Sequence, residues 1–238
     1  MFNQPNPDNQ PFQQLRLNKF LAERLGISRR EADDLIVDGK VFVDDKIAVL
    51  GTRITPNSSV RLGDEEIRFQ NEYIYIMMNK PVGYVCSRKR QGDVPTIYEL
   101  LPEQYQKLKT VGRLDKESSG LLLFTNDGDF AYQMTHPKFA KTKVYIVKLN
   151  RDLQPLHQQM IADYGVKLED GVSKLGLTRL DTGETRRRYE VLMSEGRNRQ
   201  IRRTFAALGY EIEKLHRVSF GKYDLGDLKP GEMRLVTK

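Results

Sequence analysis

A polar turn with one central aspartate runs directly into an apolar strand near the middle of the chain. The turn spans residues 112–119, and Gly120 then opens the apolar run Leu121–Phe124. A short apolar run bounded by turn residues predicts a buried strand. We expect this layout to hold the carboxylate of Asp115 at the edge of a sheet, with Arg113 two residues away. An aspartate so placed is either a turn former or the reactive group of a site.

The charge of the chain favours a polyanionic partner. The 238 residues carry a net charge of +7, which RNA or an acidic membrane surface would complement. Residues 1–71 are close to neutral, with ten lysines and arginines against eleven aspartates and glutamates. The positive excess therefore belongs to residues 72–238.

One arginine cluster dominates that excess. Only Glu190 and Glu195 oppose it within the same segment. Its members are Arg186, Arg187, Arg188, Arg197, Arg199, Arg202 and Arg203. Because the planar guanidinium donates two parallel hydrogen bonds, such a cluster is suited to binding phosphate.

Several protein classes are disfavoured by composition. A single cysteine, Cys86, cannot form an intramolecular disulfide and is expected to be a small buried residue in a reducing compartment. No apolar stretch is long enough to cross a membrane, and the N-terminus is not typical of a signal peptide. Residues 1–14 are rich in Asn, Gln and Pro and predict a flexible tail. We therefore expect a cytoplasmic protein.

Residues 15–70 predict a small α+β unit. The first helix has an apolar stripe of Leu17, Phe20, Leu21 and Leu25. The second begins at Ser28, with Glu31 as its capping-box partner, and ends near Gly39. A short hairpin over residues 41–47 follows, with an Asp-Asp turn.

Three segments of this unit resemble the S-four (alpha-L) RNA-binding domain: Arg16–Leu21, Ser28–Ala32 and Gly39–Asp44. The resemblance implies that the two helices present basic side chains to RNA phosphates. The matching positions are Arg16, Lys19, Arg29 and Arg30. The alternative is a structural unit whose arginines are only solvated, which the near-neutral charge supports.

After a join at residues 69–72, residues 73–238 predict a second and larger α+β domain. Strands are expected at Tyr73–Met78, Leu121–Thr125, Lys143–Leu149 and Tyr189–Met193, and helices at 96–101 and 153–162. A turn from Gly196 is expected to lead into a third helix, with Gly209 past its end. The strands and helices follow no βαβ rhythm. They therefore favour a mostly antiparallel mixed sheet with flanking helices.

This second domain resembles the pseudouridine synthases, in the branch that modifies ribosomal RNA (the RsuA/RluB/RluE/RluF type). The specific blocks are Gly112–Asp115 and Gly196–Arg203, and Asn79–Ser87 supports them. The resemblance covers residues 16 to about 236. Two departures are Ser118, followed by a second serine, where a threonine is frequent, and Met233 where tryptophan is frequent.

The resemblance implies a set of site residues. Asp115 would be the catalytic aspartate, Arg202 its electrostatic partner and Tyr145 the aromatic that packs on the target base. Leu215, in Lys-Leu-His-Arg, would line the pocket, and Arg113 would help to hold a flipped nucleotide. We add Arg197 and Arg199, from the arginine cluster, as substrate-binding candidates.

The implied reaction moves uracil from its N1 to its C5 attachment on the same ribose, so it requires neither cofactor nor metal. Asp115 could attack C1′ as a nucleophile or remove the C2′ proton, and both routes stay open. A glycosidase would need two carboxylates across the bond. The nearest candidates, Asp127 and Asp129, are expected to be turn and helix-cap residues. The three histidines and one cysteine have no metal-ligand spacing, and we assign no histidine a catalytic role.

Two other functions stay open at this stage. One is a non-catalytic RNA-binding or ribosome-assembly factor that retains the fold, and the other is a synthase that acts on tRNA. The motifs slightly favour 23S over 16S rRNA but do not name the uridine, or whether free RNA or an assembling subunit is the substrate. We expect a monomer.

Overall fold

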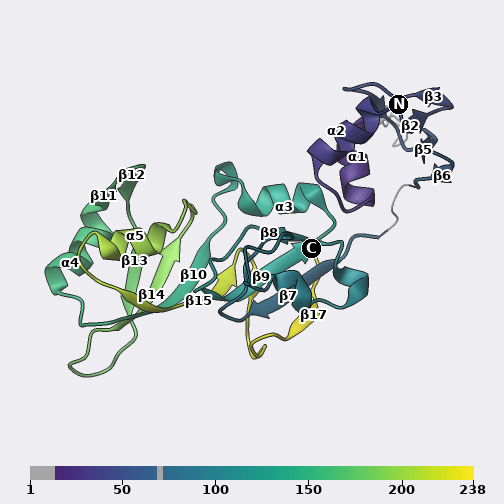
Figure 1. Cartoon of the computed structure of the whole chain (residues 1–238). Helices are drawn as coiled ribbons and strands as arrows, with labels where there is room; N and C mark the ends of the chain where they lie inside the picture. The colour runs from purple at the N-terminus through teal and green to yellow at the C-terminus, as the bar shows by residue number, and fades with distance from the viewer. Residues whose placement is uncertain (1–13, 69–71) are drawn as a thin grey trace, which may run out of the picture. The chain divides into compact units, whose positions relative to one another are not determined.

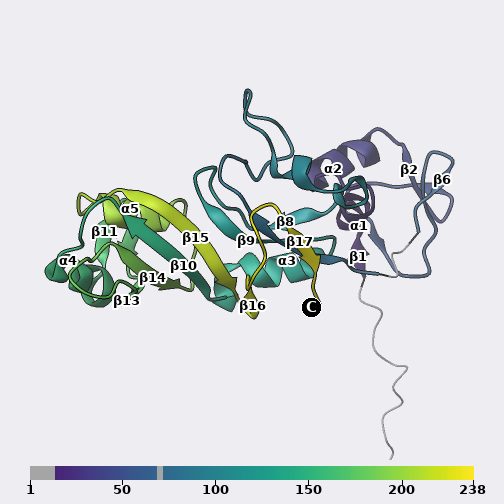
Figure 2. The ribbon, with the colours of Figure 1, turned by 90° about the horizontal axis from the view of Figure 1, so that it is seen from below.

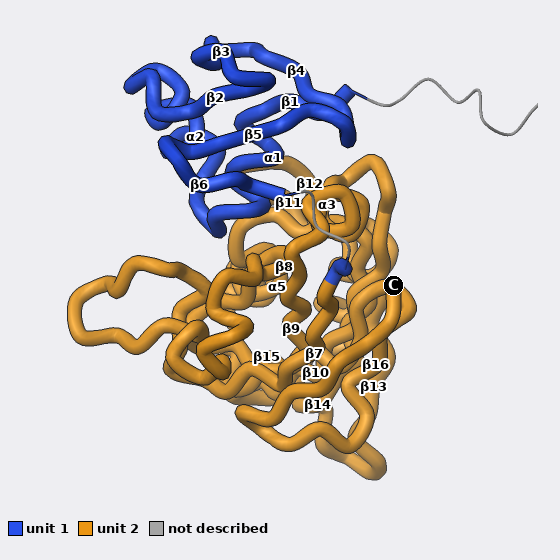
Figure 3. The backbone as a smooth tube through the Cα atoms, turned by 90° about the vertical axis from the view of Figure 1, so that its right-hand side faces the viewer, with its two compact units in different colours: residues 1–73 blue, residues 74–238 orange. Residues whose placement is uncertain are grey.

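The structure is a computed structural model that describes residues 14–68 and 72–238. It divides into two compact units, residues 1–73 and 74–238 (Figure 3). The predicted tail, apart from Gln14, and most of the predicted join lie outside the described residues. Each unit is described below by itself.

Unit 1 places two helices against short antiparallel strands. The helices are α1 (Leu17–Arg24) and α2 (Arg29–Val37), and the strands are β1 (Leu15–Arg16), β2 (Val41–Val43), β3 (Lys46–Ile47), β4 (Arg53–Ile54), β5 (Val60–Leu62) and β6 (Glu65–Glu66). Among the described residues, one sheet has the order β3-β2-β5-β6 and a second pairs β1 with β4. The predicted apolar stripe forms the core, since Leu17, Phe20 and Leu21 are almost fully buried.

The local signals of unit 1 are confirmed at two places. The hydroxyl of Ser28 accepts a hydrogen bond from the Glu31 backbone N–H at 3.1 Å, and the Glu31 carboxylate accepts one from Ser28 N–H at 2.7 Å. This capping box starts α2. Asp44 and Asp45 both take positive φ and close the predicted hairpin between β2 and β3.

Unit 2 is built on one large mixed sheet (Figures 1 and 2). Its strands are β7 (Tyr75–Lys80), β8 (Lys109–Val111), β9 (Ser119–Thr125), β10 (Lys143–Leu149), β13 (Gly176–Arg179), β14 (Arg188–Met193), β15 (Ile212–Phe220), β16 (Tyr223–Asp224) and β17 (Met233–Leu235). The main order is β13-β14-β10-β15-β9-β7-β17. Every pair is antiparallel except β15 with β9, so the predicted mostly antiparallel mixed sheet is confirmed.

The half of the sheet that contains β7 and β9 is covered on both faces. Helix α3 (Gly128–Thr135) packs Phe130 and Met134 on one face, against Leu121 and Leu123. The two 3-10 turns η1 (Ile97–Leu100) and η2 (Glu103–Tyr105) lie beside the other face, where Leu122 and Phe124 are buried. Burial on both faces explains why the predicted strand is apolar at successive positions.

The other half of the sheet, from β13 to β15, is covered on one face. There α5 (Gln200–Ala206) buries Ile201 and Phe205 against Tyr145 and Val147 of β10. The remaining elements near it are α4 (Pro155–Gln159), a π-helical turn (Met160–Tyr164) and the hairpin of β11 (Val166–Leu168) and β12 (Gly171–Ser173). A last 3-10 turn, η3 (Pro137–Phe139), follows α3.

Two predicted boundaries move. The first strand of unit 2 runs to Lys80, because its partner β9 extends back to Gly120. The helix expected at 153–162 begins only at Pro155, which has no N–H to donate and suits the first turn. The turn expected after Gly196 leads into α5 at Gln200, because Arg199 has φ +46 and cannot belong to the helix.

Among the described residues, no helix is both long enough and apolar enough to cross a membrane.

Candidate active site

A cleft of about 280 Å³ in unit 2 brings together the predicted site residues of that unit. It is lined by all seven of them: Arg113, Asp115, Tyr145, Arg197, Arg199, Arg202 and Leu215. These residues come from the turn before β9, from β10, from α5 and the segment that leads into it, and from β15. Segments about a hundred residues apart in the sequence therefore share one cavity.

Asp115 lies at the beginning of a central strand. The turn leads into β9, which has β7 on one side and β15 on the other. The first residues of β9 pair in parallel with β15, Ser119 beside His216 and Gly120 beside Arg217. Gly120 has φ +105, and a Cβ there would collide with the Arg217 backbone. A glycine is thus required where the two halves of the sheet join.

A fully buried lysine holds the Asp115 turn from beneath. The Lys80 ammonium donates hydrogen bonds to the carbonyls of Pro81 (2.9 Å), Asp115 (3.2 Å) and Ser118 (2.8 Å). All three ammonium hydrogens therefore have backbone acceptors. Burial lowers the pKa of Lys80, while the nearby Cys86 and Asp115 oppose that shift. The lysine fixes the backbone that carries the carboxylate.

The carboxylate of Asp115 is paired with Arg199. Arg199 Nη1 lies 3.3 Å from Asp115 Oδ2 and 3.1 Å from Glu117 Oε2, so one guanidinium bridges two carboxylates. The Asp115 side chain is 32 % exposed and Arg199 43 % exposed, so the pair is open to a ligand. The hydrogen bond from Arg199 also lowers the pKa of Glu117.

Arg202, expected as the partner of Asp115, instead holds the turn through its backbone. Its guanidinium donates to the carbonyls of Ile212 and Glu117, each at 3.1 Å, and lies 3.4 Å from Ser118 Oγ. Burial and the neighbouring Arg199 lower the pKa of Arg202, whereas Asp115 raises it. Arg202 thus acts on Asp115 through the electric field, without a direct ion pair.

Tyr145, Leu215 and Arg217 line the cleft from strands β10 and β15. Tyr145 on β10 lies directly across from Arg217 on β15, and all three side chains are more than nine-tenths buried. Arg217 Nη1 lies 3.5 Å from the Tyr145 hydroxyl. This part of the cleft combines an aromatic face, an aliphatic side chain and a buried cation.

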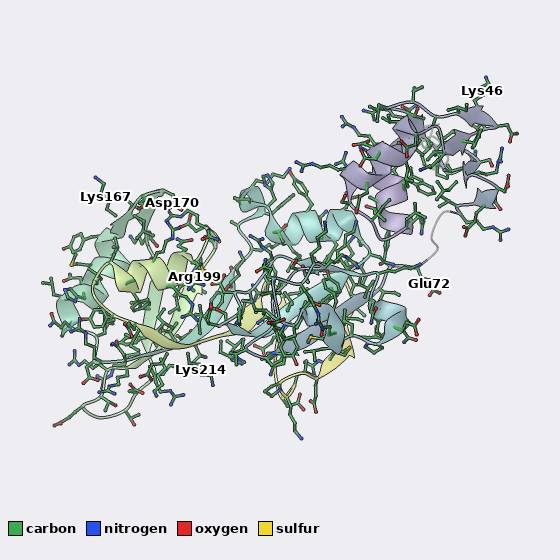
Figure 4. The ribbon with its side chains drawn as sticks, in the orientation of Figure 1. Lys46, Glu72, Lys167, Asp170, Arg199 and Lys214 are labelled. Carbon is green, nitrogen blue, oxygen red and sulfur yellow. The ribbon has the colours of Figure 1, made fainter. Side chains whose placement is uncertain are left out.

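Two other candidates differ in what their guanidinium groups do. Arg197 donates to Asp170, Gly171 and Val172 and pairs with Glu195, so its donors are used to attach the β11–β12 hairpin to the site. Figure 4 shows Asp170 and Arg199 on one side of the β10–β15 sheet and Lys214 on the other. Arg113 is exposed and, within the described residues, makes no ion pair or side-chain hydrogen bond.

The seven-arginine cluster is divided by strand β14. Residues 186–188 precede and begin the strand, and Arg187 there pairs with Asp152 at 3.2 Å. The other four follow its end; Arg197, Arg199 and Arg202 line the cleft, whereas Arg203 pairs with Asp170 at 2.7 Å. Sequence proximity had joined two groups that the strand separates.

In unit 1 the four predicted RNA-binding positions lie on or beside the first two helices. Arg16, Arg29 and Arg30 are exposed and Lys19 is half-buried. Arg29 donates a 3.2 Å hydrogen bond to Asn18 of α1, which ties the start of α2 to the other helix.

The remaining predictions concern single residues. Asp127 is the N-cap of α3 and accepts from Phe130 N–H at 2.9 Å, as expected. Cys86 is half-buried rather than buried, and its sulfur lies 3.5 Å from the backbone nitrogen of Leu114. None of the three histidines lines the cleft. Among the described residues, no three histidine, cysteine or acidic side chains are grouped as a metal site requires.

Two protein-family models match the chain. The family model described as RNA pseudouridylate synthase matches residues 74–207. The chain belongs to the RNA pseudouridylate synthase family. A second model, the S4 domain, matches residues 15–65, so the resemblance noted for unit 1 is also confirmed.

Relatives of this synthase family align over almost the whole chain. "Ribosomal large subunit pseudouridine synthase B" of Bacillus subtilis is 33 % identical and aligns over 93 % of this chain and 92 % of its own. "Ribosomal small subunit pseudouridine synthase A" of Yersinia pestis is 37 % identical, over 94 % and 95 %. The structure titled "Crystal structure of pseudouridylate synthase" superposes with a TM-score of 0.66 at 34 % identity, over 94 % and 96 %.

Two residues of the synthase site were missed by the sequence analysis. Lys80 follows a β-prone run and was read only as part of a supporting block. Arg217 stands two residues after Leu215, and residues i and i+2 of a strand face the same side. This spacing could have identified Arg217 from the sequence, because a residue on the same strand face as Leu215 is expected to face the same cleft.

Proposed function

We propose that the protein isomerises one uridine of ribosomal RNA to pseudouridine, with Asp115 as the catalytic group and without a cofactor. The observation that carries the proposal is the cleft, where the partly exposed carboxylate of Asp115 shares one cavity with the six other predicted residues. The names of the two relatives support ribosomal RNA as the substrate class.

The chemistry asks one carboxylate to act at the ribose. Asp115 either attacks C1′ or takes the C2′ proton, and in both routes the C1′–N1 electron pair leaves with the base. Its backbone is held by Lys80 while its carboxylate stays partly exposed, so it is positioned and reachable. Arg199 pairs with this carboxylate at 3.3 Å, and Arg202 places a second positive charge near it.

The part of the cleft lined by Tyr145 and Leu215 would receive the base. The uridine must leave its stack to enter the cleft, at a cost of a few kcal/mol that contacts in the pocket offset. Tyr145 offers a stacking face and Leu215 an apolar contact, while the exposed Arg113 can hold the flipped nucleotide. Arg197 would support the site through the β11–β12 hairpin rather than bind phosphate itself.

Unit 1 would bind the RNA around the target. Arg16, Lys19, Arg29 and Arg30 lie on or beside the helices of an S4 domain, which supports contacts with phosphates. We further propose that residues 15–70 and 73–238 are the functional domains, and that the protein is a cytoplasmic monomer that requires no metal.

Large-subunit rRNA is the slightly favoured substrate, on sequence motifs alone. Relatives named for either subunit match the chain over the same length, so the comparisons favour neither.

The test uses 16S, 23S and tRNA transcripts that carry tritium at uridine C5. Joining C5 to C1′ expels the C5 hydrogen, so isomerisation releases tritium to water. Wild type should release it from one rRNA, whereas Asp115→Asn should release none and still bind that RNA within a few fold. Asp163→Asn, an exposed aspartate outside the cleft, is the matched control.

Other outcomes select the alternatives. Release from tRNA alone, with binding as tight as that of rRNA at the same salt concentration, would establish the tRNA synthase. Binding of rRNA without release by wild type would establish the non-catalytic factor. Activity of Asp115→Asn equal to that of wild type would overturn the catalytic assignment.

A further inference from the structure

Arg217 occupies a position that the function described so far leaves unexplained. It is 2 % exposed and lies on β15 between Tyr145 of β10 and Gly120 of β9, where the two halves of the sheet join. It also lines the cleft that contains Asp115. A guanidinium therefore lies in the wall of the proposed base pocket.

The donors of this guanidinium are only partly used. Arg217 Nε donates to the Leu121 carbonyl at 2.7 Å, which fixes the side chain. Nη1 lies 3.5 Å from the Tyr145 hydroxyl, so the outer end of the group is beside the phenol. Nη2 is buried and has no hydrogen-bond partner among the described residues.

The charge is also without a carboxylate. Within the described part of the chain Arg217 forms no ion pair, and its closest aromatic neighbour is Phe220, whose ring centroid is 4.8 Å from the guanidinium carbon. Burying a cation without a counter-ion and with an unused donor costs free energy. The arrangement therefore indicates that a ligand supplies the acceptor, either an anion or a carbonyl oxygen. Arg197 and Arg202 also each bury one unpartnered Nε, but Arg197 pairs with carboxylates, and both hold backbone carbonyls with their terminal nitrogens.

The reaction supplies such a group. When the C1′–N1 bond breaks, its electron pair stays on uracil, and the charge spreads from N1 to the O2 and O4 carbonyl oxygens. The base then turns, C5 bonds to C1′, the C5 hydrogen leaves as a proton and N1 gains one. Asp115 returns to its starting state in either route.

We propose that Arg217 is a catalytic residue, whose guanidinium donates a hydrogen bond to a carbonyl oxygen of the detached uracil and stabilises its negative charge. The proposal rests on the proposed isomerase function. The position beside Tyr145 suits this role, because the base that stacks on the phenol presents its carbonyl oxygens at its edge. A preorganised donor of this kind contributes about 10²-fold to a rate.

The competing interpretation is a purely structural Arg217 that supports β9 and the Tyr145 hydroxyl. Both interpretations predict slower isomerisation by Arg217→Gln, so the readout must report a contact with the base. Sulfur in place of a carbonyl oxygen weakens a hydrogen bond that the oxygen accepts, so thio-substituted RNA supplies that readout.

The experiment measures single-turnover tritium release from the rRNA fragment that wild type modifies, with uridine, 2-thiouridine or 4-thiouridine at the target. Arg217→Gln should slow the uridine reaction about 10²-fold while the RNA affinity stays within a few fold. One thio-substitution should slow wild type about tenfold but should not slow Arg217→Gln further. Arg234→Gln, at an exposed arginine on β17, should behave as wild type.

The outcomes separate the two proposals. Equal thio effects in wild type and in Arg217→Gln would overturn the contact with the base. The same is true if Arg217→Gln reacts at the wild-type rate. Inactive wild type would instead overturn the isomerase function itself. Arg217→Lys keeps the positive charge but loses the planar guanidinium with its two terminal nitrogens. The same thio-substitution experiment can be done with this variant if Arg217→Gln fails to fold.

Discussion

Two buried cations support the cleft, and they use their hydrogen-bond donors differently. Lys80 contacts the backbone of the Asp115 turn, and Arg217 lies beside Tyr145. Lys80 is fully buried, and its three hydrogens all have backbone carbonyl acceptors. Arg217 is 2 % exposed and donates to one carbonyl, and its Nη2 has no hydrogen-bond partner in the part of the chain that the structure describes. The donors of Lys80 are therefore all used in the free protein, whereas Arg217 has an unused donor that a ligand could satisfy.

This difference predicts that Lys80 contributes more than Arg217 to the free energy of unfolding. Lys80→Met leaves the Ser118 and Pro81 carbonyls without the donor that Lys80 supplies, and takes one of two donors from the Asp115 carbonyl, so it should lower the free energy of unfolding by about 3 kcal/mol. Arg217→Met takes a donor from only one carbonyl and removes an unpaired charge, so it should cost only about 1 kcal/mol. Urea unfolding of both variants measures the two losses. If Arg217→Met is the more destabilised variant, the distinction between the two cations is wrong.

The pH dependence of stability sharpens the same contrast. Burial lowers the pKa of Lys80 in the folded chain, so between that pKa and the ordinary value near 10.4 the unfolded chain binds more protons. The free energy of unfolding contributed by Lys80 therefore rises with pH through this window. The gap between wild type and Lys80→Met should be wider at pH 10 than at pH 8. The gap to Arg217→Met should stay constant, because arginine remains protonated throughout that range.

The smallest effect on stability is expected at the exposed cation of the site. Arg199 bridges Asp115 and Glu117, but the three side chains are 43, 32 and 57 % exposed, so Arg199→Ala should cost less than about 0.5 kcal/mol at pH 7. The hydrogen bond from Arg199 lowers the pKa of Glu117, so this small contribution is present above the ordinary glutamate value and is lost as the pH falls below it. Thermal unfolding of Arg199→Ala at pH 7 and pH 4 checks both statements. A loss of 2 kcal/mol or more would mean that Arg199 is a structural cation like Lys80.

The sequence was informative where the determinants are local. The capping box of Ser28 with Glu31 and the N-cap role of Asp127 depend on residues three apart, and both were predicted correctly. The apolar run after Gly120 is a strand, and its burial on both faces explains its composition. Family motifs and the arginine cluster together identified seven residues that the fold brings into one cleft.

What the sequence could not predict depends on distant pairing. The register that places Arg217 opposite Tyr145 joins strands about seventy residues apart, and no local pattern encodes it. The pairing of Asp115 with Arg199 instead of Arg202 depends on the backbone of Arg199, which takes a positive φ just before α5. The arginine cluster was read as one surface, because the sequence does not show that a strand divides it.

The most direct test of the central claim maps pseudouridine in cells. Carbodiimide-dependent reverse-transcription stops on 16S and 23S rRNA would be compared in cells that lack the gene and in the same cells complemented with wild type or Asp115→Asn. We predict one stop that disappears without the gene and returns only with wild type, which would also identify the uridine. An unchanged map on both rRNAs, or a stop restored equally by Asp115→Asn, would contradict the account.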